Sequence, residues 1–464
     1  MSYALYSHQK EMLRLATEND RFLFLAEVGT GKTLPMLIHM SNLLLSGEID
    51  SALVVAPLSG LGAWKRDIKK LSPERQRLID RALTLVNYDR LSRKTSKWRE
   101  TCWKSWGMVV LDEGHAIKKH TSNRTQYFVG KGHALGLASK AQYRYLLTGT
   151  LITNSHLEDL WAPLRFLFDD EWMTWADFKR HYLVTRTLPG SYAEIVVGYR
   201  HRAELLETVA QCSYRILKKD CLDLPEQLPD EVVLVPWATG KNAEPFNKST
   251  KELYADALES YVEALDLVSD NPLTRLLHMR QIAAGHIKEQ DTRDEQGKKQ
   301  RGRTYRLNND KVRYAMELVE NNSPHKTVIF YQFRETCVAL EDALKKTGRT
   351  YVTLNGDQPD KEIWRRFQDD DAISVIVVQY QSGSSAIDLF AASYTIFMEP
   401  TDSSFVNEQA HGRTHRSGQK QACNYVFLLT EGSVEEDMYR KLELHEDFGE
   451  QAYREVARAQ RRRR

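Results

Sequence analysis

The chain has 464 residues, of which 42% are hydrophobic, and its 65 basic and 63 acidic side chains leave a net charge of +2. At about 150 residues per compact unit this length predicts two to three units, and the apolar fraction is large enough to give each one a core. The sequence has no long apolar run, and its first residues lack a basic stretch leading into one. We therefore expect a soluble protein made and kept inside the cell, without a membrane partner.

Charge and cysteine usage limit the classes of partner and site. Balanced charge still permits a local basic face for nucleic acid. The terminal run Arg461–Arg464 specifies no geometry, which favours a solvated tail over a specific phosphate contact. The cysteines are scattered without a Cys-x-x-Cys pair, which indicates neither a disulfide framework nor a structural zinc site. They are Cys102, Cys212, Cys221, Cys337 and Cys423.

The first predicted helix opens at Tyr6, because Met12, Leu13 and Ala16 are spaced for one buried face. Gln9 lies within it and carries an amide whose donor and acceptor can pair with an adenine edge. A lone glutamine near the start of a chain is more often a surface residue. Both interpretations of Gln9 stay open at this point.

The segment Ala26–Thr33 has the pattern of a phosphate-binding loop. It follows Phe22–Leu25, predicted as a strand, and precedes Leu34–Leu45, predicted as a helix. Backbone N–H groups of such a turn and the positive end of the helix dipole attract an anion, a lysine reaches the outer phosphates, and a hydroxyl ligates Mg²⁺. A consensus glycine is replaced by Ala26, so an ordinary strand-helix turn is the alternative. The predicted ATP ligands here are Gly29, Thr30, Gly31, Lys32 and Thr33.

Ser59 is a candidate contact to a nucleic-acid backbone. It comes after Ala52–Pro57, a short apolar run predicted as a buried parallel strand, and before a predicted helix that contains Trp64. A hydroxyl at a helix start can hold a backbone phosphate, although N-capping is its commoner role.

Two adjacent carboxylates, Asp112 and Glu113, follow the predicted strand Met108–Leu111. Open parallel sheets place their chemistry at the carboxyl ends of their strands. Asp112 suits Mg²⁺, which prefers oxygen ligands, and Glu113 can orient or deprotonate an attacking water. A solvated Asp-Glu turn is the alternative, and the phosphate loop upstream weakens it.

A further predicted strand, Tyr145–Leu147, ends in small hydroxyl residues. The hydroxyls of Thr148 and Thr150 could relay a change at the phosphates to neighbouring loops. From about Asn154 to Leu217 the pattern becomes helical and rich in aromatic residues. Core packing is favoured for most of these aromatic rings over stacking on bases.

The second half of the chain predicts another α/β unit. Ser249 and Glu252 form a capping box at the start of a predicted helical insertion. Five apolar runs then alternate with helical segments, and none of them leads into a phosphate loop. Two α/β units of which one carries the nucleotide signature predict a cleft where the second unit closes over the ligand. The predicted strands are Thr327–Phe330, Tyr351–Leu354, Val375–Val378, Tyr394–Met398 and Tyr425–Leu429.

Arg413 and Arg416 are the candidate cations of this second unit. They lie three residues apart within Gln409–Gln419, and they share one face if the segment is helical. Guanidinium groups stabilise the charge of a transferring phosphoryl group, an effect of about 10³ to 10⁵ in rate. A solvated helix face is the alternative.

Several motifs, taken in order, resemble the Swi/Snf-like branch of the superfamily 2 helicase-related ATPases. Asp112–His115 is similar to the family's Asp-Glu-Ala/Gly-His box, and Gln409–Gln419 resembles its Gln-x-x-x-Arg-x-His-Arg-x-Gly-Gln motif, the most diagnostic stretch. Other similar segments are Gly29–Thr33, Ile117–Lys118, Leu147–Asn154, Leu217–Asp220, Gly383–Leu389 and Ser433–Leu442. Departures from the family pattern, where an acid, Asn, Gly and Asn are usual, occur at Ala26, Lys119, Ala386 and Asp388.

The resemblance implies an α/β fold of two tandem RecA-like lobes with mainly parallel sheets, helical insertions between them and ATP in the cleft between the lobes. It implies an ATP-binding lobe with a helical protrusion at 1–224, a linker with a helical insertion at 225–310, and a second lobe with a brace helix and a basic tail at 311–464. ATP and Mg²⁺ are the implied ligands, and movement along double-stranded DNA driven by ATP hydrolysis is the implied activity.

The resemblance also assigns roles to residues. Lys32, Asp112, Glu113, Arg413 and Arg416 are the implied catalytic residues. Gln9 and Gln409 join the loop in binding ATP, while Thr33 and Asp112 are the implied metal ligands. Candidates for coupling or DNA contact are Ser59, Lys118, Thr148, Thr150, Gly383 and Ser384.

Two other functions compete with a duplex translocase. One is a strand-separating DNA or RNA helicase, although the sequence has no obvious separating pin. The other is a non-enzymatic nucleic-acid-binding module with a lapsed motor, although such proteins usually lose the catalytic residues that are present here. Little chain is left for a targeting module, so we expect a compact cytoplasmic motor of a bacterial or virus-infected cell, or a subunit targeted by protein partners. Forked or branched DNA is an alternative track.

Overall fold

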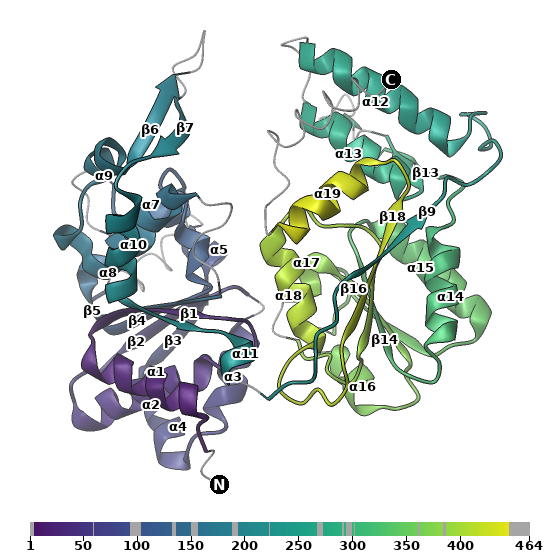
Figure 1. The fold of residues 1–464 in the computed structure, drawn as a ribbon. Helices are drawn as coiled ribbons and strands as arrows, with labels where there is room; N and C mark the ends of the chain where they lie inside the picture. Colours follow the sequence, from purple (N-terminus) through teal and green to yellow (C-terminus); the bar gives the residue numbers. More distant parts are fainter. Residues whose placement is uncertain are drawn as a thin grey trace. The chain divides into compact units, whose positions relative to one another are not determined.

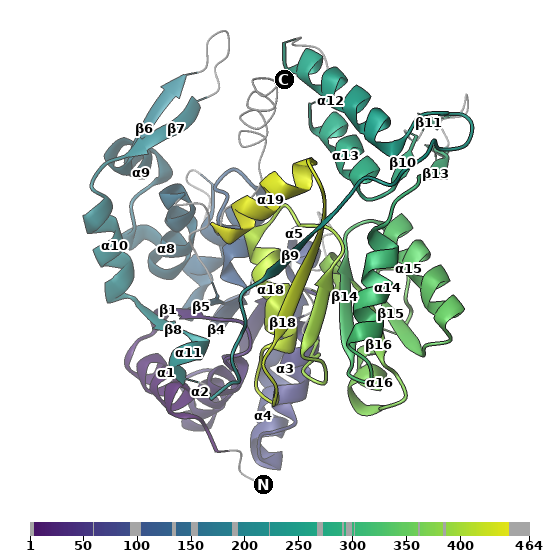
Figure 2. The ribbon, with the colours of Figure 1, turned by 45° about the vertical axis from the view of Figure 1, so that its right-hand side comes forward.

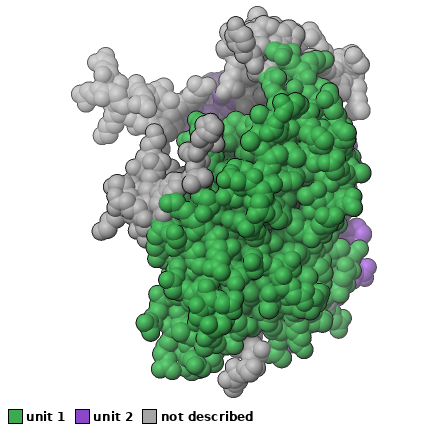
Figure 3. Space-filling view, turned by 90° about the vertical axis from the view of Figure 1, so that its left-hand side faces the viewer, with its two compact units in different colours: residues 1–223 green, residues 224–464 purple. Residues whose placement is uncertain are grey.

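The structure is a computed structural model, and its two compact units span residues 1–223 and 224–464 (Figure 3). Each unit is described by itself. Within the part of the chain that the structure describes, no helix is both long and apolar enough to cross a membrane. The described residues are 4–58, 60–92, 104–131, 136–149, 156–187, 194–221, 223–266, 272–289, 292–293, 299–300, 302–360, 362–383 and 387–444.

Unit 1 is built on a six-stranded parallel sheet with the order β3-β2-β4-β5-β1-β8 (Figure 1). The four strands predicted in this half are confirmed as β1, β2, β4 and β5. The two strands at the edges of the sheet, β3 and β8, were not predicted. The strand bounds are β1 Arg21–Ala26, β2 Ala52–Ala56, β3 Leu83–Asn87, β4 Trp106–Asp112, β5 Ala141–Thr148 and β8 Ser213–Ile216.

Helices bury both faces of this sheet, which explains its near-continuous apolar strands. Because side chains alternate along a strand, Phe22 and Phe24 pack with α1 to α4 on one face, while Leu23 packs with α5 and α7 to α10 on the other. The bounds are α1 Ser7–Glu18, α2 Thr33–Ser46, α3 Leu61–Ile68, α4 Pro73–Ala82, α5 Tyr88–Ser92, α7 Asn123–Val129, α8 Trp161–Phe168, α9 Trp175–Tyr182, α10 Arg202–Gln211 and α11 Lys218–Cys221. Short 3-10 helices are η1 Gly114–Ile117, η2 Leu137–Lys140, η3 Leu157–Leu160 and η4 Asp169–Glu171.

The helical prediction for 154–217 is wrong in its middle. Leu183–Thr187 (β6) and Glu194–Tyr199 (β7) form an antiparallel hairpin that projects beyond α9 (Figure 1). Both runs are rich in Val, Ile, Thr and Tyr, and such residues fit a pleated surface better than a helix. The expected core packing of aromatic rings is confirmed for Trp161, Phe166 and Phe178, which are buried.

Unit 2 contains a second six-stranded parallel sheet, with the order β15-β16-β14-β17-β18-β9. All five strands predicted in this half are confirmed, and the edge strand β9 was not predicted. Helices α14 and α15 cover one face of the sheet, and α16, α18 and α19 cover the other. The strand bounds are β9 Glu231–Val235, β14 Thr327–Tyr331, β15 Tyr351–Leu354, β16 Val375–Gln379, β17 Tyr394–Phe397 and β18 Asn424–Thr430. The helix bounds are α14 Lys311–Asn321, α15 Arg334–Thr347, α16 Trp364–Asp369, α17 Tyr380–Gly383, α18 Ser404–Thr414 and α19 Val434–Glu443.

Two long helices, α12 (Thr250–Asp266) and α13 (Pro272–Ala283), lie side by side in unit 2 (Figures 1 and 2). The predicted capping box is confirmed, since the Ser249 N–H donates to Glu252 Oε2 at 2.7 Å and the Glu252 N–H donates to Ser249 Oγ at 3.2 Å. The helix pair therefore starts where the sequence places it. Short antiparallel strands follow it, namely β10 His286–Lys288 with β13 Thr304–Arg306, and β11 Thr292–Arg293 with β12 Lys299–Gln300.

A buried polar network lies just beyond the carboxyl end of β17 and involves residues of α14, α15 and α19. Glu399 accepts hydrogen bonds from the Gln332 N–H at 2.9 Å and from the Thr336 hydroxyl. Lys311 donates to Glu435 nearby. Burial raises the pKa of Glu399 from its ordinary 4.5 to about 7, although Lys311 and the two donors oppose the rise. Glu399 is thus a buried acid that titrates near neutral pH.

This network predicts a pH-dependent stability. The folded protein holds a proton on Glu399 that the unfolded chain has lost, so the stabilisation is full below about pH 4.5 and is lost as the pH rises to about 7, a change on the order of 3 kcal/mol. Glu399→Gln stays neutral throughout. We expect its melting temperature to fall less than that of the parent between about pH 5 and pH 8, measured by calorimetry.

The exposed Glu431→Gln is the matched control, and its pH profile should follow the parent. Parallel profiles for Glu399→Gln and the parent would show that Glu399 does not titrate in this range.

Candidate functional site

The phosphate-like loop lies between the end of β1 and the start of α2. Gly29 has φ 94° and Gly31 has φ 77°, a left-handed backbone conformation that residues other than glycine rarely adopt. A Cβ on Gly31 would also lie 2.5 Å from Gln9 Nε2. Thr33, the first residue of α2, is buried. The loop therefore presents a backbone turn directly before a helix start, where anions bind.

Two side chains of helix α1 contact backbone carbonyl oxygens of this loop. The His8 Nε2 atom lies 2.8 Å from the carbonyl oxygen of Thr30, and Gln9 Nε2 donates to the carbonyl oxygen of Gly31 at 3.0 Å. Gln9 Oε1 in turn accepts the Tyr6 N–H at 3.1 Å. Gln9 is therefore buried against the loop rather than exposed on the surface, and its amide contacts the turn itself. The contact from His8 was not predicted.

The carboxylates at the end of β4 meet the lysine of the loop. Lys32 Nζ donates to Glu113 Oε1 at 2.9 Å and lies 3.5 Å from Asp112 Oδ1. Glu113 has φ 53° and ψ 53°, a left-handed conformation that is costly for a side chain of this kind and is often found at functional sites. The fold thus brings together residues that the sequence separates by about eighty positions, with β5 between their two strands.

Burial and charge compete at this cluster. Burial alone would lower the pKa of Lys32, but the attraction of Glu113 and Asp112 outweighs it and raises the pKa above its ordinary value. Burial also raises the pKa of Asp112, with Lys32 opposing the rise. Lys32 is therefore a charged ammonium whose counter-ions are both carboxylates, in a site that is only about a tenth exposed, with 11% of the Lys32 side chain accessible.

Two aromatic residues position Asp112, and sequence reasoning missed both roles. Trp64 Nε1 donates to Asp112 Oδ2 at 2.9 Å, and the Tyr88 hydroxyl donates to the Asp112 carbonyl oxygen at 2.9 Å. Trp64 is fully buried. A buried indole N–H usually has a hydrogen-bond acceptor. A tryptophan on an otherwise apolar helix face was therefore the sequence signal that a polar group lies next to it.

A further chain of contacts links Glu113 to the end of β5. His115 Nδ1 lies 3.5 Å from Glu113 Oε2 and 3.2 Å from Thr148 Oγ1. Burial lowers the pKa of His115 to about 4, so its ring is neutral at physiological pH. The lysine, Glu113, His115 and Thr148 therefore form one continuous series of polar contacts. Lys118, just beyond it, lies 3.4 Å from Asp159.

In unit 2 the two candidate arginines are arranged differently from the expectation. Arg413 lies in the last turn of α18 and is 4% exposed, whereas Arg416 follows the end of that helix. The helix ends before Arg416, so the condition for a shared helical face is not met for this pair. Gln409, one turn before Arg413, is buried on the same helix.

Residues 387–389, at the end of the segment Gly383–Leu389, contact both candidate arginines, Arg413 and Arg416. The Leu389 N–H donates to the carbonyl oxygen of Arg413 at 2.9 Å, and Arg416 donates to the carbonyl oxygen of Ile387 at 3.1 Å. Arg416 also forms an ion pair with Asp388. Asp388, a departure from the family pattern in the sequence, is thus the acidic partner of a candidate catalytic arginine.

The candidates for coupling and DNA contact are only partly within the described residues. Gly383 is the last residue of α17, and Thr148 is buried at the end of β5. Ser59, Thr150 and Ser384 lie outside the described residues, as does the arginine-rich tail. These contacts stay predictions.

The donor set at the loop fits a hard cation together with an anion. Asp112 and Thr33 supply carboxylate and hydroxyl oxygens, which Mg²⁺ prefers to nitrogen or sulfur. The Lys32 ammonium beside Asp112 and Glu113 demonstrates that the acids already stabilise positive charge there. Backbone N–H groups at the start of α2 provide the complementary anion site. The arrangement suits a metal-bound polyphosphate.

Comparison with known proteins gives matches along most of the chain. Residues 8–285 match the family described as SNF2-related domain, and residues 310–418 match the helicase conserved C-terminal domain. Protein CHROMATIN REMODELING 24 of Arabidopsis thaliana is 24% identical over 94% of this chain and 45% of its own length. DNA excision repair protein ERCC-6-like of Homo sapiens is 24% identical over 94% of this chain and 40% of its own.

DNA repair and recombination protein RDH54 of Saccharomyces cerevisiae (strain YJM789) is 23% identical over 86% of this chain and 46% of its own length. The chain spans less than half the length of these curated relatives. Among solved structures, the Sulfolobus solfataricus SWI2/SNF2 ATPase core in complex with dsDNA aligns with a TM-score of 0.40 and 22% identity, covering 96% of this chain and 92% of that one.

The close contact between Gly114, which follows Glu113, and Leu146 gives a testable prediction. A Cβ on Gly114 would lie 2.0 Å from Leu146 Cδ2, which is fully buried in β5. We expect Gly114→Ala to cost about 1–3 kcal/mol through overpacking. In a Leu146→Ala background the clashing methyl is gone, so the same substitution should cost nothing or restore stability.

Free energies of unfolding in urea for the parent, both single variants and the double variant measure this coupling. An equal cost of Gly114→Ala in both backgrounds would contradict the packing argument.

Proposed function

The chain belongs to the SNF2-related domain family, and on this premise we propose that it is an ATP-dependent motor that moves along double-stranded DNA. The motor would couple ATP hydrolysis to translocation or to remodelling of DNA and protein–DNA complexes. The observation that carries the proposal is the contact of Lys32 with Asp112 and Glu113 directly after a glycine turn. Phosphoryl transfer needs little covalent chemistry from the protein, and mainly needs groups that position and stabilise charge, which this cluster supplies.

We propose that the phosphates of bound ATP replace Glu113 as the ion-pair partner of Lys32. In the structure the ammonium is bonded to Glu113, so neither group is available for another task. A polyphosphate on the loop would compete for Lys32 with a higher charge, and Glu113 would then be left to orient or deprotonate a water. Thr33 and Asp112 would hold Mg²⁺, which neutralises charge on the phosphates when bound.

The arginines of unit 2 would complete the reaction. Arg416 is held by Asp388 and by the carbonyl oxygen of Ile387, so it would exchange these partners for phosphate oxygens. Gln409 Oε1 is buried and has no hydrogen-bond partner among the described residues, which supports a role in ligand binding. We propose that the two units act on one ATP and that their closing and opening is the motor stroke.

We propose duplex DNA as the track. The printed names of the relatives refer to chromatin remodelling and to DNA repair and recombination. The polar series from Glu113 through His115 to Thr148 offers a path by which the state of the phosphates reaches the end of β5. Contacts to the track would be mainly to phosphates, with little base preference and strong salt dependence. Forked DNA, targeting partners and a cytoplasmic location stay predictions.

The proposal predicts ATPase activity that duplex DNA stimulates more than single-stranded DNA or RNA does, measured at equal nucleotide concentration with the full chain. Glu113→Gln should lower kcat by about 10² to 10⁴, because the group that activates water is neutralised. Glu431→Gln, at an exposed position, should match the parent.

Equal or better stimulation of the ATPase activity by RNA would contradict the proposal that duplex DNA is the track. Unchanged ATP turnover in Glu113→Gln would contradict the proposal that Glu113 is catalytic. Strand displacement by the parent would favour a helicase instead.

The arginine assignment predicts a separate loss. Arg413→Ala and Arg416→Ala should each lower kcat by about 10³ or more while DNA binding persists, because charge on the transferring phosphoryl is no longer stabilised. Arg416→Lys keeps the charge but not the planar fork, and should recover little. Arg440→Ala removes an arginine of α19 that pairs with Asp437, and serves as the control.

Steady-state kinetics of these four variants decide the matter. A kcat within a few fold of the parent for Arg416→Ala would remove that residue from the site.

A further inference from the structure

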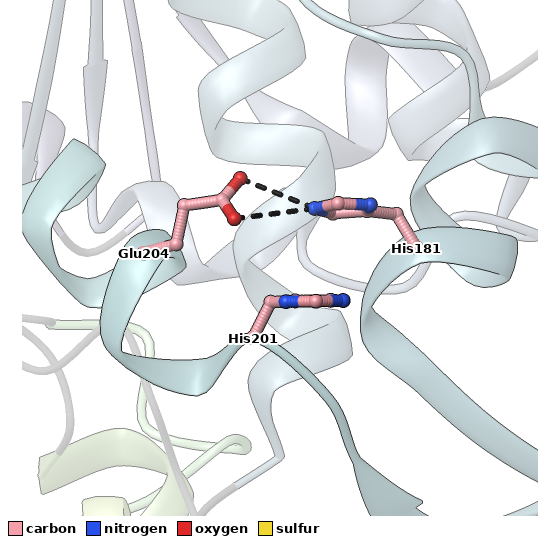
Figure 4. Close-up of side chains that lie close together, drawn as sticks. All are labelled: His181, His201 and Glu204. Carbon is pink, nitrogen blue, oxygen red and sulfur yellow. Dashed lines mark hydrogen bonds and ion pairs between the residues drawn. The ribbon is translucent and has the colours of Figure 1, made fainter.

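Three side chains with metal-binding chemistry gather at the base of the β6–β7 hairpin (Figure 4). His181 lies in the last turn of α9, His201 immediately precedes α10, and Glu204 lies in the first turn of α10. His181 Nε2 lies 3.1 Å from Glu204 Oε1 and 3.3 Å from Glu204 Oε2. One donor atom from each of the three lies within 4.8 Å of the others.

The base of the hairpin brings the two histidines close together. Leu183 pairs with Tyr199, and beyond this pair the Arg200 N–H donates to the carbonyl oxygen of Tyr182 at 2.7 Å. His181 directly precedes Tyr182 and His201 directly follows Arg200, so this hydrogen bond joins the backbone next to both histidines. Their imidazole rings are stacked, with centroids 4.5 Å apart and an interplanar angle of 11° (Figure 4).

A hydrogen bond holds Glu204 in place beside them. The Tyr182 hydroxyl donates to Glu204 Oε1 at 2.9 Å. Glu204 lies three residues after His201, and one donor atom of each lies within 4.8 Å of the other and of a nitrogen of His181. The carboxylate thus faces the histidine pair (Figure 4).

We propose that His181, His201 and Glu204 bind a first-row transition-metal dication of the Zn²⁺ class. Two imidazole nitrogens and a carboxylate oxygen are a donor set that suits Zn²⁺, whereas Mg²⁺ and Ca²⁺ prefer all-oxygen sites. Bonds of about 2.0–2.1 Å in a tetrahedral site place neighbouring donors about 3.3 Å apart. The His181–Glu204 pair already has this spacing.

His201 must turn to complete the site, because the in-plane lone pairs of two parallel rings do not converge. The side chain of His201 is exposed, and among the described residues its ring stacks on the ring of His181. The ion would replace the proton that is shared between His181 and Glu204. It would also cross-link α9, the base of the hairpin and α10. A fourth position would stay open to water. The inference does not depend on the proposed motor function.

The test uses the full chain without a polyhistidine tag, stripped with a chelator and titrated with Co²⁺ alone, followed by visible absorption and by displacement with Zn²⁺. We expect a single site with a dissociation constant on the order of 10 µM or tighter. His201→Asn and Glu204→Gln should each weaken it by at least about tenfold. Asparagine tolerates the φ of 46° at His201, and glutamine can still accept from Tyr182, so both variants should fold.

His325→Ala, at an exposed histidine of unit 2, is the matched control and should bind like the parent. Zn²⁺ should also slow hydrogen exchange of the Arg200 amide in the parent and in the control, but in neither site variant. Unchanged binding in His201→Asn and Glu204→Gln, or an equal loss in His325→Ala, would mean an adventitious ion only and would overturn the proposal.

Discussion

The contact of one buried lysine with two carboxylates is the interaction on which the candidate site depends. Lys32 would lose hydration at little benefit if Glu113 and Asp112 did not lie against it, and the two acids would repel each other without it. Lys32 therefore offsets the repulsion between the two acids, and the acids stabilise its buried charge. A ligand with several negative charges can rearrange such a triad, because it offers Lys32 a better partner and leaves an acid free.

The parallel sheet is what makes this contact possible. The strands of the six-stranded sheet of unit 1 all run in the same direction, so the carboxyl ends of β1, β4 and β5 lie on the same side of the sheet. Only β5 separates β1, which leads into the loop, from β4, which leads into Asp112 and Glu113. Trp64 and Tyr88 reach Asp112 from elements that the β2 and β3 crossovers supply. In unit 2 the same architecture brings Asp388 to Arg416. In each unit, candidate site residues are thus held in ion pairs that a ligand would have to break.

Buried strands could be predicted from sequence because apolar side chains fill both faces, as in Ala52–Ala56. The strands of the two six-stranded sheets that were missed are all edge strands, whose polar or exposed residues interrupt the apolar run, namely Leu83–Asn87, Ser213–Ile216 and Glu231–Val235. Motif spacing identified Lys32 and Glu113, but no spacing rule relates Trp64 to Asp112 or Asp388 to Arg416. These contacts depend on tertiary packing, as does the meeting of His181 and His201 across a hairpin that the helical interpretation overlooked.

The central claim is that Glu113 and a nucleotide compete for Lys32. Calorimetric titration with a non-hydrolysable ATP analogue and Mg²⁺ measures this competition directly in the parent and in Glu113→Gln. Removing the charge of Glu113 frees Lys32 from its closest partner, so the account predicts tighter binding by about tenfold, equivalent to about 1.4 kcal/mol. Weaker binding of the analogue by Glu113→Gln would contradict it.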